Sequence, residues 1–194
     1  MKIAEKLSKK LKTPRQVQKY LRGLPYNREK KGETLFSAEK ALQRQKLHCF
    51  EAAFAAAAIL EYHGYPPLVM SLESKDDLDH VIYVFKKGTR WGAIGLSRDQ
   101  GLHGRPPRYR SLRDLAWSYY DPYVDKTGMI TAYQVAHLDD CKVDWRTSKK
   151  NVWKAEKYLI KLKHRPLKSS KARYKKLLKN YLQHGPMPRQ KDWW

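Results

Sequence analysis

The segment HCFEAAFAAAAILEYH, residues 48–63, constrains the fold more than any other part of this sequence. The twelve residues that begin at Cys49 contain a single polar side chain, Glu51, and this pattern predicts a helix. A helix that is apolar on almost every side is stable only when other elements surround it. Gly64 and the proline pair that begins at Pro66 predict where it ends. We therefore expect this helix to lie at the centre of the fold.

Short strands are expected to follow this helix. Four apolar segments, rich in β-branched and aromatic residues, predict them at 68–72, 80–85, 91–96 and 129–137. A short loop, Lys86–Thr89, joins the second and third segments and indicates an antiparallel hairpin. That loop would place His80 opposite Gly95 and Phe85 opposite Arg90. Residues 98–110 predict an irregular loop.

Helices are expected on both sides of the strand region, at 1–12, 14–24, 38–47, 111–120, 149–163 and 169–182. Thr13, Ser37 and Ser111 precede three of these segments and are suited to cap them. Because the strands gather in the middle of the chain and the helices at its ends, the sequence predicts an α+β fold with a small antiparallel sheet.

Charge divides the chain into three parts. The sequence of 194 residues has 41 Lys and Arg against 19 Asp and Glu, a net charge of +22. Residues 1–46 carry 14 basic and 4 acidic residues, residues 47–140 carry 10 and 12, and residues 141–194 carry 17 and 3. We predict a near-neutral core at 47–140 between basic helical extensions, the second of which packs on the core. Such extensions attract nucleic acid or another polyanion by counterion release, or are simply solvated charged faces.

Several classes of function are not indicated. Two cysteines cannot form a disulfide framework, and no Cys/His cluster has the spacing of zinc ligands. The sequence contains neither GxxxxGK[ST] nor GxGxxG. No apolar run approaches the roughly 18 residues of a membrane span, and the charged start MKIAEKLSKKLK is unlike a secretion signal. We expect a cytoplasmic protein without a membrane span and without a cofactor.

Cys49 is the candidate nucleophile because it stands at the first turn of the central helix. Unpaired N–H groups and partial positive charge at a helix N-terminus favour the thiolate. No Ser, Thr, Asp or Asn occupies residues 46–48, so those N–H groups are expected to be free to hold an oxyanion. His80, at the start of a predicted strand, would serve as the base. The alternative is that Cys49 is a small buried apolar residue.

The stretches HCFEAAFAAAAILEYHGYPP, DHVIYVF and RWGAIGL together resemble the core of the transglutaminase-like proteins, which belong to the papain-like cysteine enzymes. The resemblance covers about residues 44–100. In that family the nucleophile begins the helix, a His opens the next strand and a Trp begins the strand after it. Cys49, His80 and Trp91 match these positions. The resemblance implies a papain-like core, thiol chemistry, and a place for Trp91 beside the substrate.

The family's third catalytic residue, usually Asp, follows the Trp by about four residues, where this chain has Gly95. The resemblance leaves Ser97, Asp99 or no residue for this role, and we choose Asp99 for its charge. Asp79 would point to the opposite face of a regular strand. Papain-like proteases also carry a Gln six residues before the Cys as an oxyanion donor, and Gln43 has this spacing.

Other residues have plainer interpretations. His48 is expected to bond to the local backbone, and His103 to be exposed in its loop. The helix-spaced aromatic residues Trp117, Tyr119, Tyr120 and Tyr123 are expected in the core rather than as a base-stacking surface.

Two functions are therefore compared. The first is a thiol enzyme, either a peptidase or amidase or a transglutaminase-like acyl transferase, that acts on a protein, peptide or amide through Cys49 and His80. The second is a catalytically impaired binding module that docks on nucleic acid or another polyanion through its basic extensions.

Overall fold

The structure is a computed structural model that describes residues 2–29, 32–74 and 80–194. The described residues form seven α-helices: α1 Ile3–Lys10, α2 Pro14–Arg22, α3 Ala38–Arg44, α4 Cys49–Leu60, α5 Leu112–Tyr123, α6 Trp153–Lys161 and α7 Lys171–His184. The strands are β1 Leu68–Ser74, β2 His80–Lys87, β3 Arg90–Ile94, β4 Arg105–Tyr109, β5 Ile130–His137 and β6 Arg165–Pro166. Short 3-10 helices are η1 Glu61–His63, η2 Gln100–Leu102 and η3 Leu138–Cys141.

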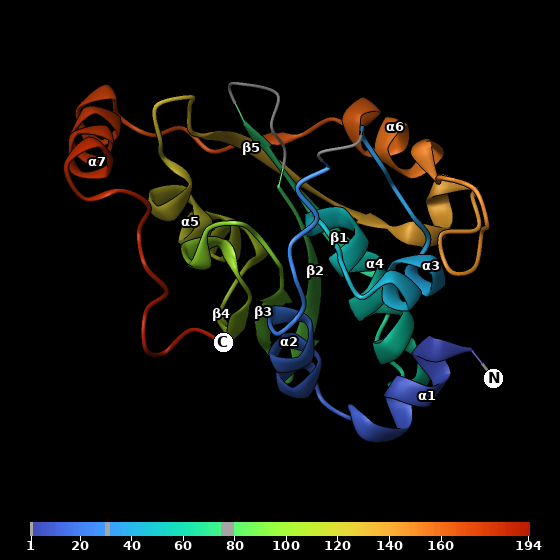
Figure 1. The fold of residues 1–194 in the computed structure, drawn as a ribbon. Coiled ribbons are helices and arrows are strands. Elements are labelled where there is room, and N and C mark those ends of the chain that lie inside the picture. Colours follow the sequence, from blue (N-terminus) through green and yellow to red (C-terminus); the bar gives the residue numbers. More distant parts are fainter. Residues whose placement is uncertain (1, 30–31, 75–79) are drawn as a thin grey trace.

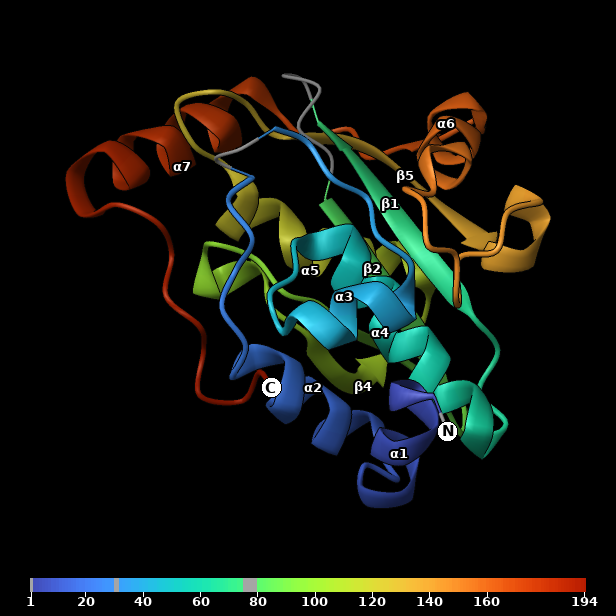
Figure 2. The same cartoon turned by 45° about the vertical axis from the view of Figure 1, so that its right-hand side comes forward.

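The strands form one antiparallel sheet in the order β4-β3-β2-β1-β5-β6. Figures 1 and 2 show α1 to α4 on one side of this sheet and α5 and α7 on the other. The α+β prediction is confirmed, with helical segments before and after a papain-like core. The sheet is larger than expected because the loop predicted at 98–110 contains β4 and the connection between the last two predicted helices contains β6. The two prolines of β4 are accommodated because β4 lies at the edge of the sheet.

Alternation along β2 produces two hydrophobic cores. Val81, Tyr83 and Phe85 pack on the α4 side, and Ile82 and Val84 pack on the α5 side. Successive side chains of a strand point to opposite faces, so a central strand covered on both faces is apolar throughout.

Helix α4 lies at the centre, as its composition predicts, and every residue from Phe50 to Leu60 is buried. Both basic segments contribute to the core around it, since Val17, Leu21 and Trp145 have no exposed surface. The division of the chain at residues 46 and 140 stays a prediction. Thr13, Ser37 and Ser111 each accept a backbone N–H at the start of a helix, which confirms the three predicted caps.

The register predicted for the β2–β3 hairpin is wrong by two residues. Phe85 lies opposite Gly92 and Lys87 lies opposite Arg90, so the connection is a two-residue turn. Gly88 adopts a φ of +57°, which Gly reaches without strain. Because the turn is shorter than predicted, the strand pairing continues to Lys87 and Arg90.

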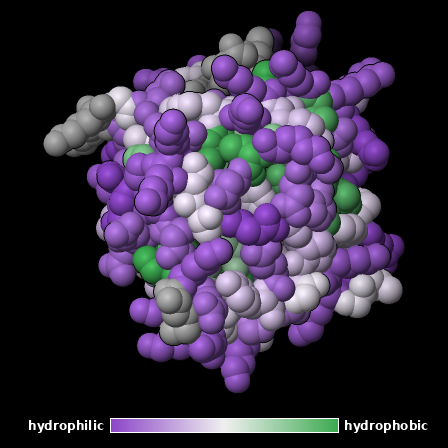
Figure 3. Space-filling model, turned by 90° about the vertical axis from the view of Figure 1, so that its right-hand side faces the viewer, coloured by the Kyte–Doolittle hydropathy of each residue, from purple (hydrophilic) through white to green (hydrophobic). Residues whose placement is uncertain are grey.

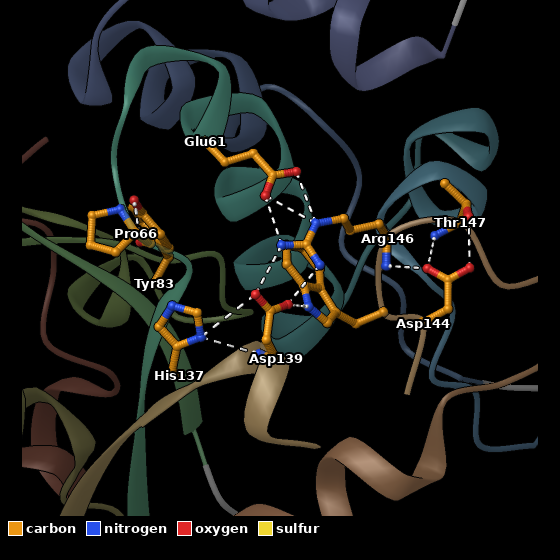
Figure 4. A network of polar contacts seen from close by, with 9 residues as sticks. Glu61, Pro66, Tyr83, His137, Asp139, Asp144, Arg146 and Thr147 are labelled. Carbon is orange, nitrogen blue, oxygen red and sulfur yellow. Dashed lines mark hydrogen bonds and ion pairs between the residues drawn. The ribbon is translucent and has the colours of Figure 1, made fainter. Parts of the chain in front are cut away.

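A polar network anchors the end of α4 to the end of β5. Arg146 contacts Glu61 of η1, at 2.9 Å between Nη2 and Oε2, and Asp139 of η3, at 2.6 Å between Nη1 and Oδ1. Figure 4 shows the guanidinium between the two carboxylates. Segments far apart in the sequence are thereby joined at the end of α4 opposite to Cys49.

The face of the molecule in Figure 3 is largely hydrophilic, with hydrophobic side chains confined to small areas. Within the described residues, no helix has both the length and the apolar composition needed to cross a bilayer.

Candidate active site

Cys49 lines a cavity of about 670 Å³ at the N-terminal end of α4. His80 at the start of β2 and Tyr26 in the segment after α2 line the same cavity, as do Arg98 and Glu156. The cavity therefore receives side chains from elements distant in the sequence. The predicted pairing of the helix-initial Cys with the strand-initial His follows from the packing of α4 on β2.

The thiol of Cys49 is acidic for a cysteine. Burial acts to raise its pKa, but hydrogen bonds with His48 and His80, together with the charges of both rings, outweigh burial and lower the pKa well below the usual value. Cys141 provides a contrast within the same chain, because burial and the charge of Asp140 raise the pKa of its thiol to about 11. The two thiols are therefore expected to differ widely in reactivity.

His80 is held from its far side by the main chain. Its Nε2 lies 2.9 Å from the carbonyl oxygen of Leu102, and the ring is buried. A carbonyl only accepts, so Nε2 carries the proton of this hydrogen bond. Nδ1 is then the ring nitrogen that is free to contact Cys49. The carbonyl fixes both the tautomer and the orientation of the imidazole.

The expectation that Asp99 orients His80 is not met in the structure. Asp99 lines the cavity, but the His80 Nε2 contact belongs to Leu102. Ser97 lines the cavity as well, and its Oγ accepts the Asp99 N–H at 3.2 Å. The choice of Ser97 as the third residue therefore stays a prediction. A Cβ added at Gly95 would lie 2.9 Å from Ile82 Cγ2, 3.4 Å from the Leu102 oxygen and 3.7 Å from His80 Nε2. The Leu102 carbonyl thus approaches the space that a side chain at residue 95 would need.

The structure does not bring Gln43 or Trp91 to Cys49. Gln43 is exposed on α3, and neither residue is among the described residues that line the cavity. Trp91 lies opposite Lys86 in the hairpin and borders a separate cavity of about 370 Å³. The expected spacing for Gln43 fails because α3 ends at Arg44 and a loop intervenes before α4. Asp79 lies outside the described residues.

The N-terminus of α4 is capped, contrary to the expectation of free N–H groups. His48 Nδ1 accepts the Phe50 N–H at 3.3 Å, and Glu51 accepts the His48 N–H at 3.2 Å. An imidazole thus replaces the usual Ser or Asp of a capping box. His48 Nε2 bonds to the Thr34 carbonyl at 2.9 Å, so the expected backbone bond of His48 is confirmed.

The His48 ring also takes up a second proton readily. Burial lowers its pKa, but the hydrogen bond with Cys49 and the charges of Cys49 and Glu51 outweigh this and raise the pKa to about 9. A protonated Nδ1 has no lone pair for the Phe50 N–H. When His48 is protonated, it therefore loses the 3.3 Å contact with the Phe50 N–H and gains an interaction with the Cys49 thiolate. No sequence signal distinguishes this histidine from an ordinary cap.

Tyr26 is a site residue that the sequence does not indicate. Burial and the negative charge of Cys49 raise the pKa of its phenol, while the charge of Arg98 and a hydrogen bond from the Cys49 backbone N–H lower it. The hydroxyl is therefore bonded to the Cys49 backbone and is also influenced by the charge of Arg98. It comes from an irregular segment, and only the fold brings it to the thiol.

The remaining histidine and aromatic predictions have mixed outcomes. Tyr119 and Tyr120 are fully buried, as expected for core residues, whereas Trp117 and Tyr123 are partly exposed. The expectation that His103 is exposed is wrong. It is buried, with Nε2 3.0 Å from the Ser97 carbonyl, and burial lowers its pKa. The loop folds inward because η2 turns it back onto α5.

A Cys-bearing central helix packed on an antiparallel sheet, with a His at the start of the next strand, defines the transglutaminase-like, papain-like class of cysteine enzyme. The sequence comparisons agree with this class at a finer level. The model of the Vasohibin family matches residues 2–182, and the chain belongs to that family.

One curated relative shows the extent of the similarity. Tubulinyl-Tyr carboxypeptidase 1 of Mus musculus is 26% identical to this chain in an alignment of 123 residues, and the match covers 55% of the chain and 33% of the relative. The chain therefore matches about a third of the relative's length.

Proposed function

We propose that this chain is a cysteine carboxypeptidase, with Cys49 as the nucleophile and His80 as its base. The observation that carries this proposal is the low pKa of a thiol that is hydrogen-bonded to two imidazoles at a helix N-terminus. That thiol lines an open cavity, so a substrate can reach it. The relative's name describes a carboxypeptidase that acts on a protein, which supports hydrolysis of a polypeptide.

The chemistry requires only groups of this chain and water. The Cys49 thiolate attacks the carbonyl carbon of the last peptide bond and forms a tetrahedral intermediate. His80 Nδ1 donates its proton to the leaving amine, so the C–N bond breaks and a thioester remains. Water then loses a proton to His80 and attacks the thioester, which releases the shortened polypeptide and the thiol. Throughout, the Leu102 carbonyl accepts the hydrogen bond that the Nε2–H donates, and this keeps Nδ1 toward sulfur.

The developing oxyanion needs hydrogen-bond donors that are already in place. The Tyr26 hydroxyl accepts the Cys49 N–H, so its own hydrogen is available to an oxyanion. This hydroxyl replaces Gln43, which lies outside the cavity.

To select the C-terminal residue of a substrate, a carboxypeptidase needs a positive charge that binds the terminal carboxylate. Arg98 and Arg28 both line the cavity, and neither forms an ion pair among the described residues. Arg98 also acts electrostatically on Tyr26, whose hydroxyl is hydrogen-bonded to the Cys49 backbone. A carboxylate held by Arg98 would set the last peptide bond over the sulfur. This favours carboxypeptidase action over cleavage within a chain.

The test compares peptides with a free and an amidated C-terminus, with product identified by mass spectrometry. Cys49→Ala and His80→Ala are expected to lose turnover by at least about a hundredfold while remaining folded, because each removes a reacting group. Arg98→Met should raise KM for the peptide with a free C-terminus, so the difference in kcat/KM between this peptide and the amidated peptide should become smaller. Cys141→Ala is the matched thiol control and should be fully active. Normal turnover by Cys49→Ala, or equal cleavage of the amide and the acid, would contradict the proposal.

Acyl transfer to an amine uses the same thioester. A primary amine added during the reaction distinguishes the two, because a hydrolase yields the free acid and a transferase yields the amide. Docking of the basic segments on a polyanion stays a separate prediction.

A further inference from the structure

Arg105, the first residue of β4, carries a fully buried guanidinium. None of the ion pairs in the described part of the chain includes it. A buried charge without a carboxylate is costly, and an apolar side chain of similar size would fill this space without that cost. The position therefore needs a reason other than core packing.

The hydrogen bonds of Arg105 go mainly to backbone carbonyls around Leu102. Nη2 donates to Gly101 O at 2.7 Å, and Nη1 donates to His103 O at 2.7 Å and to Gly104 O at 3.4 Å. The residues on both sides of Leu102 are therefore bound to one planar group. The only carbonyl between them is the one that accepts from His80 Nε2.

The guanidinium is in turn fixed by α5. Nη2 donates to Ser118 O at 3.1 Å, and Nε donates to Ser118 Oγ at 3.2 Å. The Tyr119 ring lies 4.0 Å from the guanidinium carbon, and its hydroxyl donates to His103 O at 3.0 Å. The loop is thus attached to α5 through the Arg105 guanidinium and the Tyr119 hydroxyl.

The C-terminal segment covers the other face of the same group. Figure 1 shows this segment running from α7 back toward β4. The Trp193 ring lies 3.5 Å from the guanidinium carbon. Two aromatic faces and several carbonyls thus surround the cation and replace the solvent that it loses.

We propose that Arg105 is a positioning residue for the Cys49–His80 pair. By gathering the carbonyls on either side of Leu102, it fixes the Leu102 carbonyl against His80 Nε2 and so keeps Nδ1 toward the thiol. This inference rests on the proposed function, since it concerns the same pair. It adds a residue that does not line the active-site cavity.

The test is the pH dependence of iodoacetamide alkylation at Cys49, read by peptide mass spectrometry, with Cys141 as the internal reference. Arg105→Lys keeps the charge but cannot reach carbonyls on both sides of Leu102. Arg105→Met removes the charge at similar length. We expect both variants to shift the Cys49 profile upward by about one pH unit, which corresponds to a tenfold smaller thiolate population. With a cleaved peptide, kcat should fall about 10- to 100-fold with KM nearly unchanged.

Arg108→Met is the matched control. Arg108 lies on the same strand and binds Asp192 of the same C-terminal segment, but it contacts none of the loop carbonyls. Its alkylation profile should equal that of the wild type. An equal shift in Arg108→Met would assign the effect to loosening of the C-terminal segment and overturn the proposal. Unchanged profiles in both Arg105 variants would overturn it as well.

Folding is monitored by circular dichroism. If Arg105→Met unfolds, Arg105→Lys decides, and Trp193→Ala is its control, because Trp193→Ala leaves every hydrogen bond of Arg105 in place and removes only the ring on one face. A shift in folded Arg105→Lys that exceeds the shift in Trp193→Ala supports the proposal, and an equal shift in the two variants, or no shift in Arg105→Lys, rejects it. Different results would refute the proposed function and the role of Arg105. A reactive, Arg105-dependent Cys49 that cleaves no peptide would refute the peptidase, and an inert wild-type Cys49 would refute both.

Discussion

At Gly95 the chain lacks the acid that its wider enzyme class uses to orient the imidazole, and the structure shows that an acid would not fit. A Cβ there would lie 2.9 Å from Ile82 Cγ2 and 3.4 Å from the Leu102 oxygen. The first contact is closer than folded proteins tolerate, and a carboxylate would repel the second atom. In place of the acid, the Leu102 carbonyl contacts His80 Nε2.

Gly95→Asp is accordingly expected to damage the site. We expect a loss of about 1–3 kcal/mol in the free energy of unfolding from overpacking, together with an upward shift of the Cys49 alkylation profile. Denaturant unfolding measures the first effect, and alkylation of the folded fraction measures the second. A profile shifted to lower pH would show instead that the new carboxylate orients His80.

The sequence predicts individual site residues only where the signal is local. Cys49 and His80 can be predicted because a helix start and a strand start are visible in the pattern of neighbouring residues. Tyr26 and Arg98 carry no such pattern, since only tertiary packing brings them to the thiol. The Leu102 contribution cannot be predicted from residue type at all, because every residue has a carbonyl.

At the scale of elements, helix starts are predicted well and strand pairing less well. The side chains of Thr13 and Ser111 cap helices within three residues, so their signal is contained in a short window. The β2–β3 register depends on the turn at Gly88, and a two-residue turn and a longer loop have similar sequences. Strands β4 and β6 contain proline and are held by neighbours across the sheet, so local propensity argues against them.

The contact between η1 and η3 yields an element-scale prediction. Arg146→Ala removes hydrogen bonds to both Glu61 and Asp139 and should cost about 1 kcal/mol, because the group is partly exposed and screened. Arg173→Ala, which breaks a pair with the single carboxylate of Asp121, is the matched control and should cost less. Thermal unfolding of both variants checks the order, and equal losses would show that the second carboxylate contributes nothing.

The same network has a defined pH dependence. The hydrogen bond from Arg146 lowers the pKa of Asp139, so the stabilisation is complete above the unfolded pKa of about 3.9 and is lost as the pH falls through the lower folded value. The difference in Tm between the wild type and Arg146→Ala should therefore be constant near neutral pH and shrink in acid. A difference that grows toward low pH would contradict this assignment.

At the scale of the whole molecule, the boundaries of the three charge segments do not coincide with the boundaries of the folded core. The C-terminal basic segment contributes Trp145, Ala155 and Leu167 to the buried interior. Removal of residues 141–194 would therefore expose both cores and would not isolate a charge effect. In contrast, α7 has no buried residue and presents lysines to solvent.

The docking prediction is better tested on α7 alone. Lys175, Lys176 and Lys179 are exposed, and changing all three to Gln should weaken binding of a single-stranded DNA used as a polyanion probe. The slope of log K against log salt should flatten by about two, since each lost contact contributes about 0.7. Lys87→Gln and Lys126→Gln, exposed lysines of the near-neutral segment, are the controls. Unchanged binding by the triple variant would leave α7 a solvated face.

Because the contact with His80 comes from a main-chain carbonyl, it affects how the sequences of related proteins should be compared. An amino-acid substitution at residue 102 leaves the carbonyl in place, so apolar replacements that keep the loop packed should be tolerated. A deletion or insertion between Gly95 and Leu102 would instead move the oxygen away from His80, whatever residues remained. Selection on this part of the active site would therefore act on loop length, and an alignment would record it as an absence of gaps rather than as an invariant column.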